Sequence, residues 1–255
     1  MVDEIFGEPR LAAVYDALDP DRSDLQVYER IVVDELGARS VLDIGCGTGT
    51  FAIMLASRGL SVTGVDPAGA SLDVARAKRG ADAVRWLEGT LDAVEADAST
   101  GSGFDAATMT ANVAQVFVDE REWAATLGAA RRLLRPGGAL VLESRRPERR
   151  AWLDWTPEAS RQVVDVPHEG PVEDWIEVTA VDEEAPGGPI VTFRSPTLFH
   201  RDGVRIDSES TLRFRSRAAI DASLERAGFE VVDVRDAPDR PGREWVFLAR
   251  APPAG

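Results

Sequence analysis

The pattern of apolar and polar positions along residues 41–143 predicts alternating strands and helices. Short apolar runs, the first of them Val41 to Ile44, alternate with stretches in which apolar residues recur at helical spacing. The expected strands are residues 41–44, 61–65, 83–87, 104–109 and 139–142, and the expected helices are residues 50–58, 71–78 and 123–134. We expect residues 95–103, which are small and polar, to form a loop, and residues 135–138 to form a turn. A strand–helix repeat of roughly 20 to 35 residues is typical of βαβ units, so we predict a parallel sheet with right-handed crossovers.

The chain on either side of this repeat follows other patterns. Residues 1–38 are partly amphipathic and predict helix, with Gly37 at the position of a C-terminal cap. Strand-like alternation, interrupted by turn signals, predicts an antiparallel insert of three or more strands, among them residues 175–181, 190–193 and 211–214. A helix is expected at residues 218–227, and strands at residues 229–234 and 245–249.

These patterns divide the chain into three expected parts. They are an N-terminal helical cap (1–40), an α/β core (41–143 and 217–250) and a β insert (144–216). The insert is expected to form either a cap over the substrate or the surface of a homodimer.

Charge and composition narrow the possible partners. The chain has 255 residues and a formal net charge of −15. A surface this acidic repels phosphate groups, so we expect no nucleic-acid partner and no docking on a membrane. The single cysteine, Cys46, cannot form an internal disulfide, and the first residues carry acids and no apolar run. No segment approaches the roughly 18 apolar residues of a membrane span, so we expect a cytoplasmic protein.

A glycine-rich turn stands between the first expected strand and the helix that follows it. Gly45, Gly47 and Gly49 let the backbone approach a ligand closely, and the helix N-terminus offers free N–H groups. The spacing is not that of the dinucleotide fingerprint, because Thr50 stands where the third glycine would be. Asp43, just before the turn, would oppose a pyrophosphate but could hold an ammonium group. The turn therefore favours S-adenosylmethionine (SAM), which carries an ammonium group and no phosphate.

A second carboxylate follows the second expected strand. Asp66 comes 21 residues after Gly45, which is the spacing of one βαβ step. A carboxylate at that edge can accept hydrogen bonds from both hydroxyl groups of a ribose. Taken singly, Asp43 could be a turn former and Asp66 a helix cap ahead of Pro67. Together, at the ends of adjacent strands, they indicate a ligand site.

At these residues the chain resembles the class I SAM-dependent methyltransferases. Residues 41–49 match the first motif of that family, residues 64–66 its second, and residues 133–138 the turn before its fifth strand. Residues 104–107 and 228–231 look like its fourth-strand motif and the entry to its sixth strand. The resemblance covers about residues 15–143 and 217–250. It implies an α/β, Rossmann-like, doubly wound, mostly parallel seven-stranded sheet, with the antiparallel insert between strand five and the last helix, and SAM as the cofactor.

The resemblance also implies a set of cofactor-binding residues. They are Asp43, Gly45, Cys46, Gly47, Gly49, Asp66, Pro67, Thr90, Leu91, Asn112, Val113 and Tyr15. The turn at residues 43–49 would line the methionine and ribose, and Asp66 would hold the ribose hydroxyls. Pro67 and residues 89–91 would flank the adenine, and residues 110–113 would lie beside the sulfonium.

Two positions in this set depart from the family pattern or carry a second interpretation. Many relatives have Asp where Thr90 stands, so Asp92 or a backbone group would take over the contact with the adenine amine. Tyr15 resembles an N-terminal tyrosine that some small-molecule members place over the cofactor, and it could equally be a packing residue.

Methyl transfer does not require a particular catalytic side chain. It is an in-line displacement of a good leaving group, so the protein mainly aligns the reactants and excludes water. A general base helps only when the nucleophile arrives protonated, so the catalytic residues stay unassigned. The candidates are His168 and His200 as bases, although a lone histidine in a strand or loop is more often structural, and Glu143 and Gln115 as substrate contacts. We expect no resident metal ion.

A basic cluster follows the fifth expected strand. It consists of Arg145, Arg146, Arg149 and Arg150, with Trp152 and Trp155 behind them. The cluster could form a pocket for an acidic or aromatic substrate, or a solvated basic turn whose aromatic residues pack the insert down.

The function expected from these features is O- or N-methylation of a small-molecule methyl acceptor. The alternatives are a protein or RNA methyltransferase, a dinucleotide oxidoreductase and a non-catalytic SAM-binding protein. Base methylation is disfavoured, because residues 110–113 lack the Asn/Asp-Pro-Pro-aromatic run of amino-methylating enzymes. Cys46 lies in the cofactor motif rather than in a loop suited to cytosine C5 chemistry.

Overall fold

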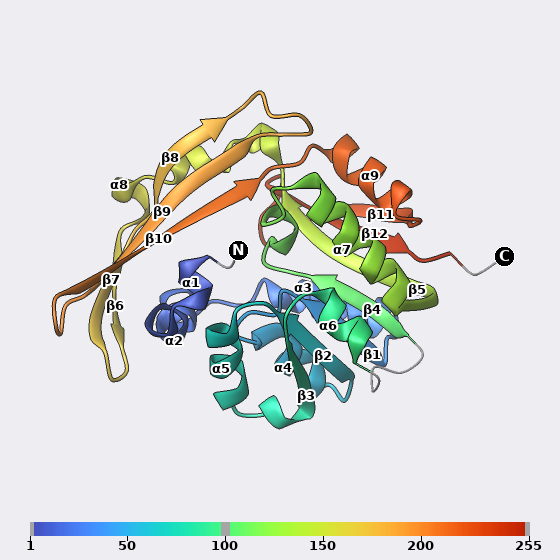
Figure 1. Ribbon diagram of the computed structural model, residues 1–255, viewed down its shortest axis with the longest axis horizontal. Coiled ribbons are helices and arrows are strands. Elements are labelled where there is room, and N and C mark those ends of the chain that lie inside the picture. The colour runs from blue at the N-terminus through green and yellow to red at the C-terminus, as the bar shows by residue number, and fades with distance from the viewer. Residues whose placement is uncertain (1–2, 98–102, 253–255) are drawn as a thin grey trace.

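Two sheets organise the computed structural model, which describes residues 3–97 and 103–252 (Figure 1). The larger sheet has seven strands in the order β11-β12-β5-β4-β1-β2-β3. These strands are β1 (Ser40–Ile44), β2 (Ser61–Asp66), β3 (Val84–Glu88), β4 (Phe104–Met109), β5 (Leu134–Arg145), β11 (Glu230–Asp236) and β12 (Glu244–Arg250). Strands β1 to β5 run parallel, and β12 is antiparallel to both β5 and β11. This confirms the predicted doubly wound, mostly parallel sheet.

Helices cover both faces of the larger sheet. They are α3 (Leu25–Arg30) with the π-helical turn η1 (Ile31–Glu35), α4 (Thr50–Ser57), α5 (Gly69–Ala77), α6 (Leu91–Ala96), α7 (Glu120–Leu133) and α9 (Arg217–Arg226). Two short 3-10 turns join these elements: η2 (Ala81–Ala83) lies between α5 and β3, and η3 (Val113–Gln115) lies between β4 and α7. Neighbouring residues of one strand point to opposite faces, so Val41 packs with Tyr28 and Phe51 on one side, and Leu42 packs with Leu127 on the other. Burial on both faces explains why these strands read as continuous apolar runs.

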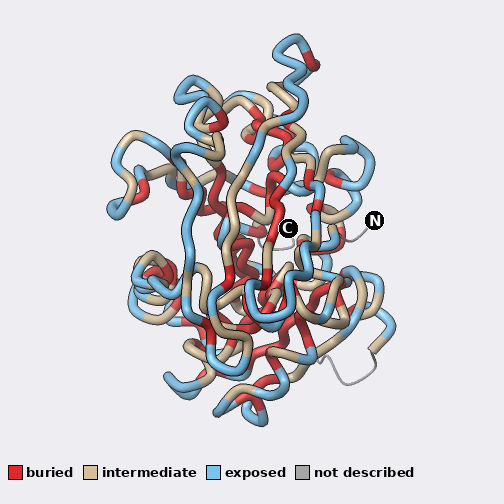
Figure 2. The backbone as a smooth tube through the Cα atoms, turned by 90° about the vertical axis from the view of Figure 1, so that its left-hand side faces the viewer, coloured by how far each residue is buried: buried red, intermediate tan, exposed pale blue. Residues whose placement is uncertain are grey.

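The second sheet is the insert. Its strands are β6 (Gln162–Val166), β7 (Gly170–Asp174), β8 (Glu177–Asp182), β9 (Ile190–Phe199) and β10 (Val204–Arg213), and all of its pairings are antiparallel. The order is β10-β9-β7-β6, with β8 also paired to β9. Three short elements lead into it, η4 (Pro147–Arg149), η5 (Ala151–Asp154) and α8 (Pro157–Ser160). Figure 2 shows that long stretches of the chain outside the larger sheet are exposed, whereas burial concentrates around that sheet.

The N-terminal helices join the two sheets. Helices α1 (Glu4–Gly7) and α2 (Pro9–Leu18) lie between the insert and α5 in Figure 1. Leu11 and Val14 of α2 share a small core with Val172 and Phe199 of the insert. On the core side, Ser71 Oγ donates a hydrogen bond of 2.9 Å to the carbonyl oxygen of Phe6. The N-terminal segment therefore contacts both the core and the insert.

The structure corrects three details of the expected elements. Residues 135–138, expected as a turn, lie inside β5, because Leu134 already pairs with Phe104 and the register then shifts. Gly138 permits this irregularity, since a Cβ there would lie 2.9 Å from the carbonyl oxygen of Arg135. Glu95 belongs to α6 rather than to a loop, and residues 98–102 of that expected loop lie outside the described residues. Strands β6 and β7 were not predicted.

Residues 253–255 also lie outside the described residues. Of the helices in the described ranges, none is both long and apolar enough to span a bilayer.

Candidate functional site at the carboxyl edge of the parallel sheet

The glycine turn folds tightly against neighbouring elements at the carboxyl end of β1. Gly45 has φ +70°, and a Cβ there would lie 2.7 Å from Val113 Cγ2. Gly49, with φ +77°, would bring a Cβ to 2.4 Å from Trp86 Cη2. Any side chain at either position would therefore clash as well as strain the backbone. The turn brings its own backbone close to Val113, one of the residues expected beside the sulfonium.

Asp43 is buried next to this turn, and only one of its two carboxylate oxygens has a hydrogen-bond partner among the described residues. Its side chain is 1% exposed, and Oδ1 accepts a hydrogen bond of 2.8 Å from Thr108 Oγ1. Among the described residues Oδ2 has no partner. Burial, followed by the negative charge of Asp66, raises the pKa of Asp43 to about 7, although the Thr108 hydrogen bond opposes the shift. A buried acceptor without a partner costs free energy until a donor such as an ammonium group reaches it.

Asp66 lies at the end of the adjacent strand and holds the glycine turn. Its Oδ2 accepts a hydrogen bond of 2.8 Å from the Gly47 backbone N–H, and its Oδ1 accepts one of 2.8 Å from that of Ala68. Burial raises the pKa of this carboxyl, against the effect of both hydrogen bonds. Each carboxylate oxygen has two acceptor sites, so both oxygens can accept a further hydrogen bond from a ribose hydroxyl.

The other expected cofactor residues surround these carboxylates. The Gly89 N–H donates to the carbonyl oxygen of Asp66 at 3.0 Å, which places the 89–91 loop beside β2. Thr90 is exposed at the start of α6, whereas Leu91 is buried. Pro67 is exposed next to Asp66. Cys46 is buried in the turn, and burial raises the pKa of its thiol strongly.

Helix α2 lies over the glycine turn through a residue that the sequence analysis missed. Asp16 Oδ1 accepts a hydrogen bond of 2.7 Å from Thr48 Oγ1, and Asp16 Oδ2 lies 2.5 Å from Lys78 Nζ. The neighbouring Tyr15 is half-buried, with its ring 5.6 Å from that of Phe6, and burial raises its pKa. No sequence pattern marks Asp16, because its partners lie 32 and 62 positions away in the chain.

A buried polar cluster lies where β4 and β5 end and β12 begins. Glu143 is fully buried, accepts a short hydrogen bond from the Tyr28 hydroxyl, and accepts one of 3.1 Å from the Asn112 N–H. Arg240 bridges two carboxylates, with Nη2 3.3 Å from Glu143 Oε2 and Nη1 3.0 Å from Glu244 Oε1. Burial and the adjacent Glu244 raise the pKa of Glu143 to about 7.

Within this cluster, the Glu143 carboxylate binds other protein groups. Its carboxylate, expected to contact substrate, is engaged by Tyr28, Arg240 and the Asn112 backbone. Asn112 itself adopts the left-handed conformation, with φ +61°, and its Oδ1 has no partner among the described residues. Sequence reasoning missed Tyr28, Arg240 and Glu244. Tyr28 belongs to a run of apolar residues at helical spacing, so the sequence predicts a packing residue there.

The two histidines lie on the exposed side of the insert. His168 is in the β6–β7 turn, and His200 Nε2 lies 2.8 Å from Glu173 Oε2 at the end of β9. Figure 1 shows these turns at the end of the insert remote from the larger sheet. This arrangement gives no support to either histidine as a base.

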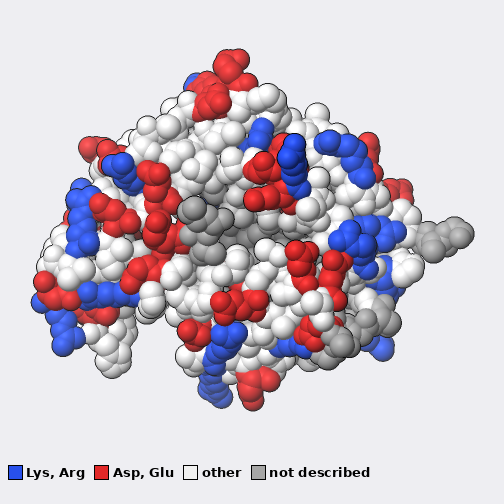
Figure 3. Space-filling model, in the orientation of Figure 1, with Lys and Arg blue, Asp and Glu red and all other residues white. Residues whose placement is uncertain are grey.

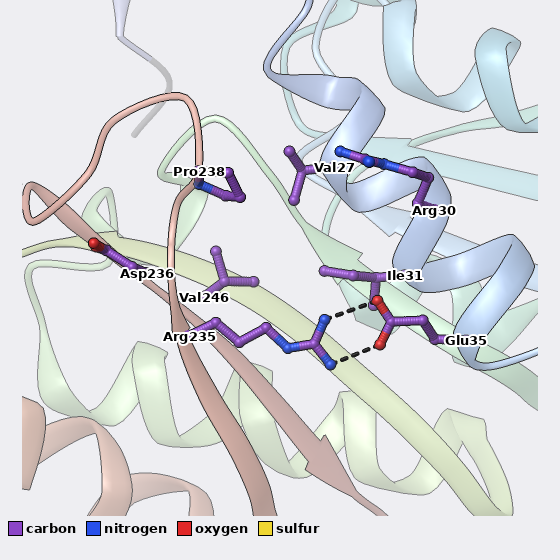
Figure 4. A pocket seen from close by; sticks show the side chains of 8 residues that line it. All are labelled: Val27, Arg30, Ile31, Glu35, Arg235, Asp236, Pro238 and Val246. Atoms are coloured by element: carbon purple, nitrogen blue, oxygen red, sulfur yellow. Dashed lines mark hydrogen bonds and ion pairs between the residues drawn. The ribbon is translucent and has the colours of Figure 1, made fainter.

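Two grooves are open on the described part of the molecule. One, of about 680 Å³, lies between β10 and residues 116–122 and includes Asp119, Glu122 and Glu209 in its lining. Acidic side chains flank the hollow seen in Figure 3. The other, of about 230 Å³, lies between η1 and the β11–β12 hairpin, where Glu35 and Arg235 form a two-pronged ion pair (Figure 4). Neither groove is lined by a residue of the glycine turn.

The seven-stranded, mostly parallel order of the larger sheet is that of the Rossmann-like methyltransferase fold, which solved structures share. Residues 41–138 match the family model described as "Methyltransferase domain". This part of the chain is similar to a methyltransferase domain, and the fold of the chain is that of SAM-dependent methyltransferases. Within the described residues, no three His, Cys, Asp or Glu side chains are grouped to hold a metal ion.

Comparison with curated proteins gives partial matches. The cypemycin N-terminal methyltransferase of Streptomyces sp is 37% identical over 115 residues, which are 44% of this chain and 44% of that protein. The chain thus matches less than half the length of such curated relatives, between 41% and 44% for the first three.

Solved structures match over nearly the whole chain. The CcbJ methyltransferase from Streptomyces caelestis has a TM-score of 0.73 at 23% identity, covering 98% of this chain and 100% of its own. The sugar N-methyltransferase KedS8 from Streptoalloteichus sp ATCC 53650 has a TM-score of 0.70 at 21% identity, covering 93% of this chain and 91% of its own. At these identities the likeness shows the fold alone.

Proposed function

We propose that this protein transfers a methyl group from SAM to an oxygen or nitrogen atom of a small molecule. One observation carries the proposal. Two buried carboxylates, Asp43 and Asp66, end adjacent parallel strands on either side of a glycine bend, and one oxygen of Asp43 has no partner among the described residues. An ammonium group at Asp43 and a ribose diol at Asp66 would complete both environments.

The remaining cofactor contacts follow from the placement of the expected residues. The turn residues Gly45, Cys46, Gly47 and Gly49 would line the amino acid and ribose. Pro67, Thr90 and Leu91 would flank the adenine, Asn112 and Val113 would lie beside the sulfonium, and Tyr15 would cover the cofactor from α2.

When bound, SAM supplies a methyl group on a sulfonium that is already a good leaving group. The chain then has to align the acceptor, exclude water and receive any proton that the acceptor loses. Asn112 Oδ1, which lacks a partner among the described residues, suits an N–H or O–H of the acceptor. The core (41–143 and 217–250) would hold the cofactor, and the insert (144–216) would cap the acceptor.

A small-molecule acceptor is favoured over a macromolecule by charge. The net charge of −15 and the acidic lining of the larger groove disfavour RNA. KedS8, one of the structural neighbours, is described as a sugar N-methyltransferase. A protein acceptor and a non-catalytic SAM-binding role are the alternatives that the experiment has to separate.

Thermal melting with different ligands tests the proposal first. SAM and S-adenosylhomocysteine should raise the melting temperature, and NAD should not. Stabilisation by NAD alone would overturn the cofactor assignment. Methyl transfer from labelled SAM is then measured against small amines, phenols, sugars and carboxylates. Binding of SAM without transfer to any of them, or to peptides, would favour the non-catalytic role.

A further inference from the structure

We propose that Arg145 and Gln115 form a subsite for a carboxylate group on the methyl acceptor. The inference rests on the proposed function, because it assigns the acceptor to the same edge of the sheet. Within the basic cluster that follows β5, the contacts of Arg145 differ from those of Arg146, Arg149 and Arg150.

The other three arginines of that cluster form hydrogen bonds or ion pairs with neighbouring parts of the chain. Arg146 Nη2 lies 2.9 Å from Asp236 Oδ1, and Arg149 Nε donates to the Gly242 carbonyl oxygen at 2.6 Å. Arg150 forms a close ion pair with Glu183. These contacts tie residues 146–150 to the β11–β12 hairpin and to the β8–β9 turn.

Arg145 has a different environment. It ends β5, with Nη1 donating to Gln115 Oε1 at 2.9 Å, Nε 3.7 Å from Glu244 Oε1, and Cζ 5.6 Å from the Trp155 ring centroid. Its Nη2 has no hydrogen-bond partner among the described residues. Burial lowers the pKa of the guanidinium although 27% of the side chain stays accessible. The guanidinium is therefore packed against protein and still within reach of a small ligand.

Gln115 supplies the second donor. Its side chain is completely buried, and Nε2 has no hydrogen-bond partner among the described residues. The amide orientation follows from Arg145, because the guanidinium can only donate and therefore faces the amide oxygen. The unpaired N–H groups of Gln115 thus lie on the same side chain that contacts Arg145. An unsatisfied buried donor of this kind is costly unless a ligand acceptor meets it.

The two donors fit a carboxylate better than a phosphate. A guanidinium nitrogen and an amide nitrogen, carried by two side chains in contact, can meet the two oxygens of a planar carboxylate. Glu143 and Glu244 lie in the same cluster as Arg145 and would repel a dianion more strongly than a monoanion. Trp155 offers an apolar face next to the guanidinium, which suits an aromatic acid.

The subsite also lies at a suitable place for methyl transfer. Gln115 and Val113 belong to the same 3-10 turn, η3, and Val113 packs against Gly45 of the cofactor turn. A carboxylate held at Arg145 would place the rest of a small acceptor between η3 and the insert residue Trp155. The carboxylate would thus fix the acceptor's orientation.

Binding is tested by calorimetry with S-adenosylhomocysteine present, using benzoate, benzamide and phenyl phosphate as probes. Benzoate should bind, and its affinity should fall at least tenfold in Arg145→Gln and in Gln115→Leu. Benzamide and phenyl phosphate should bind weakly or not at all. The matched control is Arg146→Gln, since Arg146 has the same 27% accessibility and lies 5.5 Å from the Trp245 ring. That control should bind benzoate as the wild type does.

Turnover gives an independent readout. Paired acceptors, 4-aminobenzoate and 4-aminobenzamide, present the same amine with and without the carboxylate. Arg145→Gln should raise KM for 4-aminobenzoate at least tenfold and leave methylation of 4-aminobenzamide unchanged, with Arg145→Lys intermediate. Equal effects on both acceptors, tighter binding of phenyl phosphate, or no benzoate binding by a protein that binds S-adenosylhomocysteine would overturn the subsite. Failure to bind S-adenosylhomocysteine would instead contradict the proposed function.

Discussion

The parallel core and the antiparallel insert bury their strands in different ways. Strand β4 is buried at five of its six positions, whereas five of the six positions of β8 are exposed. The difference follows from what covers them: helices lie on both faces of the core sheet, while much of the insert faces solvent. The buried carboxylates Asp43, Asp66, Glu143 and Glu244 all lie in the core. The core therefore holds the buried acidic groups around which we propose the cofactor site, whereas the insert strands contribute no buried carboxylate among the described residues.

The largest expected effect is on stability, and it comes from making the same leucine-to-alanine substitution in each of the two regions. Leu127→Ala, in α7, should lower the free energy of unfolding by about 3 kcal/mol, because the side chain is fully buried. Leu153→Ala removes the same atoms from a residue of the segment before the insert sheet that is 60% exposed, and should change stability by less than about 0.5 kcal/mol. Urea unfolding of both variants measures the difference. Equal losses would mean that burial does not distinguish the regions.

The next prediction concerns pH. Burial raises the pKa of Asp43 to about 7, so between pH 5 and 7 the folded protein holds a proton that the unfolded chain has released. This contribution to stability is present at low pH and is lost as pH rises through 7. Asp43→Asn stays neutral, so its stability relative to wild type should increase by about 2 kcal/mol from pH 5 to pH 7. Unfolding is measured in urea at each pH without ligand.

The control for this prediction is an aspartate of the insert. Hydrogen bonds from the Val204 N–H and from Arg10 lower the pKa of Asp202, which therefore stays ionised across the same window. Asp202→Asn should differ from wild type by an amount that does not change between pH 5 and 7. A constant difference for Asp43→Asn as well would argue against a protonated Asp43.

The smallest effect is expected at the junction between the regions. Asp16→Asn weakens the contacts from α2 to Thr48 and Lys78, and should lower stability by only about 1 kcal/mol, because the side chains of Asp16 and Lys78 are 34% and 26% accessible. Hydrogen exchange should speed up in residues 9–18. Asp73→Asn, which removes an exposed pair with Arg76, serves as the control and should leave exchange there unchanged. Unaltered exchange in Asp16→Asn would show that α2 is held by its apolar contacts alone.

Sequence patterns located the core more completely than the insert, for a physical reason. Strands β1, β2 and β4 and the glycine turn are marked by local signals, namely apolar runs and residues that only a tight bend requires. Strands β6 and β7 escaped because their exposed positions, such as Val163 at 59%, obscure the alternation. The start of β5 at Leu134 was also hidden, since Pro136 and Gly137 signal a turn and yet lie inside the strand.

The residues of the candidate site also differ in whether a local sequence pattern marks them. Asp43 and Asp66 stand out locally, because each follows an apolar run and flanks glycines. Arg240 and Glu244 meet Glu143 only through the pairing of β12 with β5, about 100 positions away in the chain, and no local pattern reports that contact. Arg145 differs from its neighbours only in what surrounds it.

The most direct measurement is the affinity for SAM of Asp66→Ala beside that of Asp73→Ala, by calorimetry. Asp73 is an exposed aspartate of α5, so its loss should leave the affinity unchanged. Loss of Asp66 should weaken binding by roughly 1.5–3 kcal/mol, which is about a 10- to 150-fold rise in Kd. Unchanged affinity in a folded Asp66→Ala variant would contradict a SAM site between the two carboxylates.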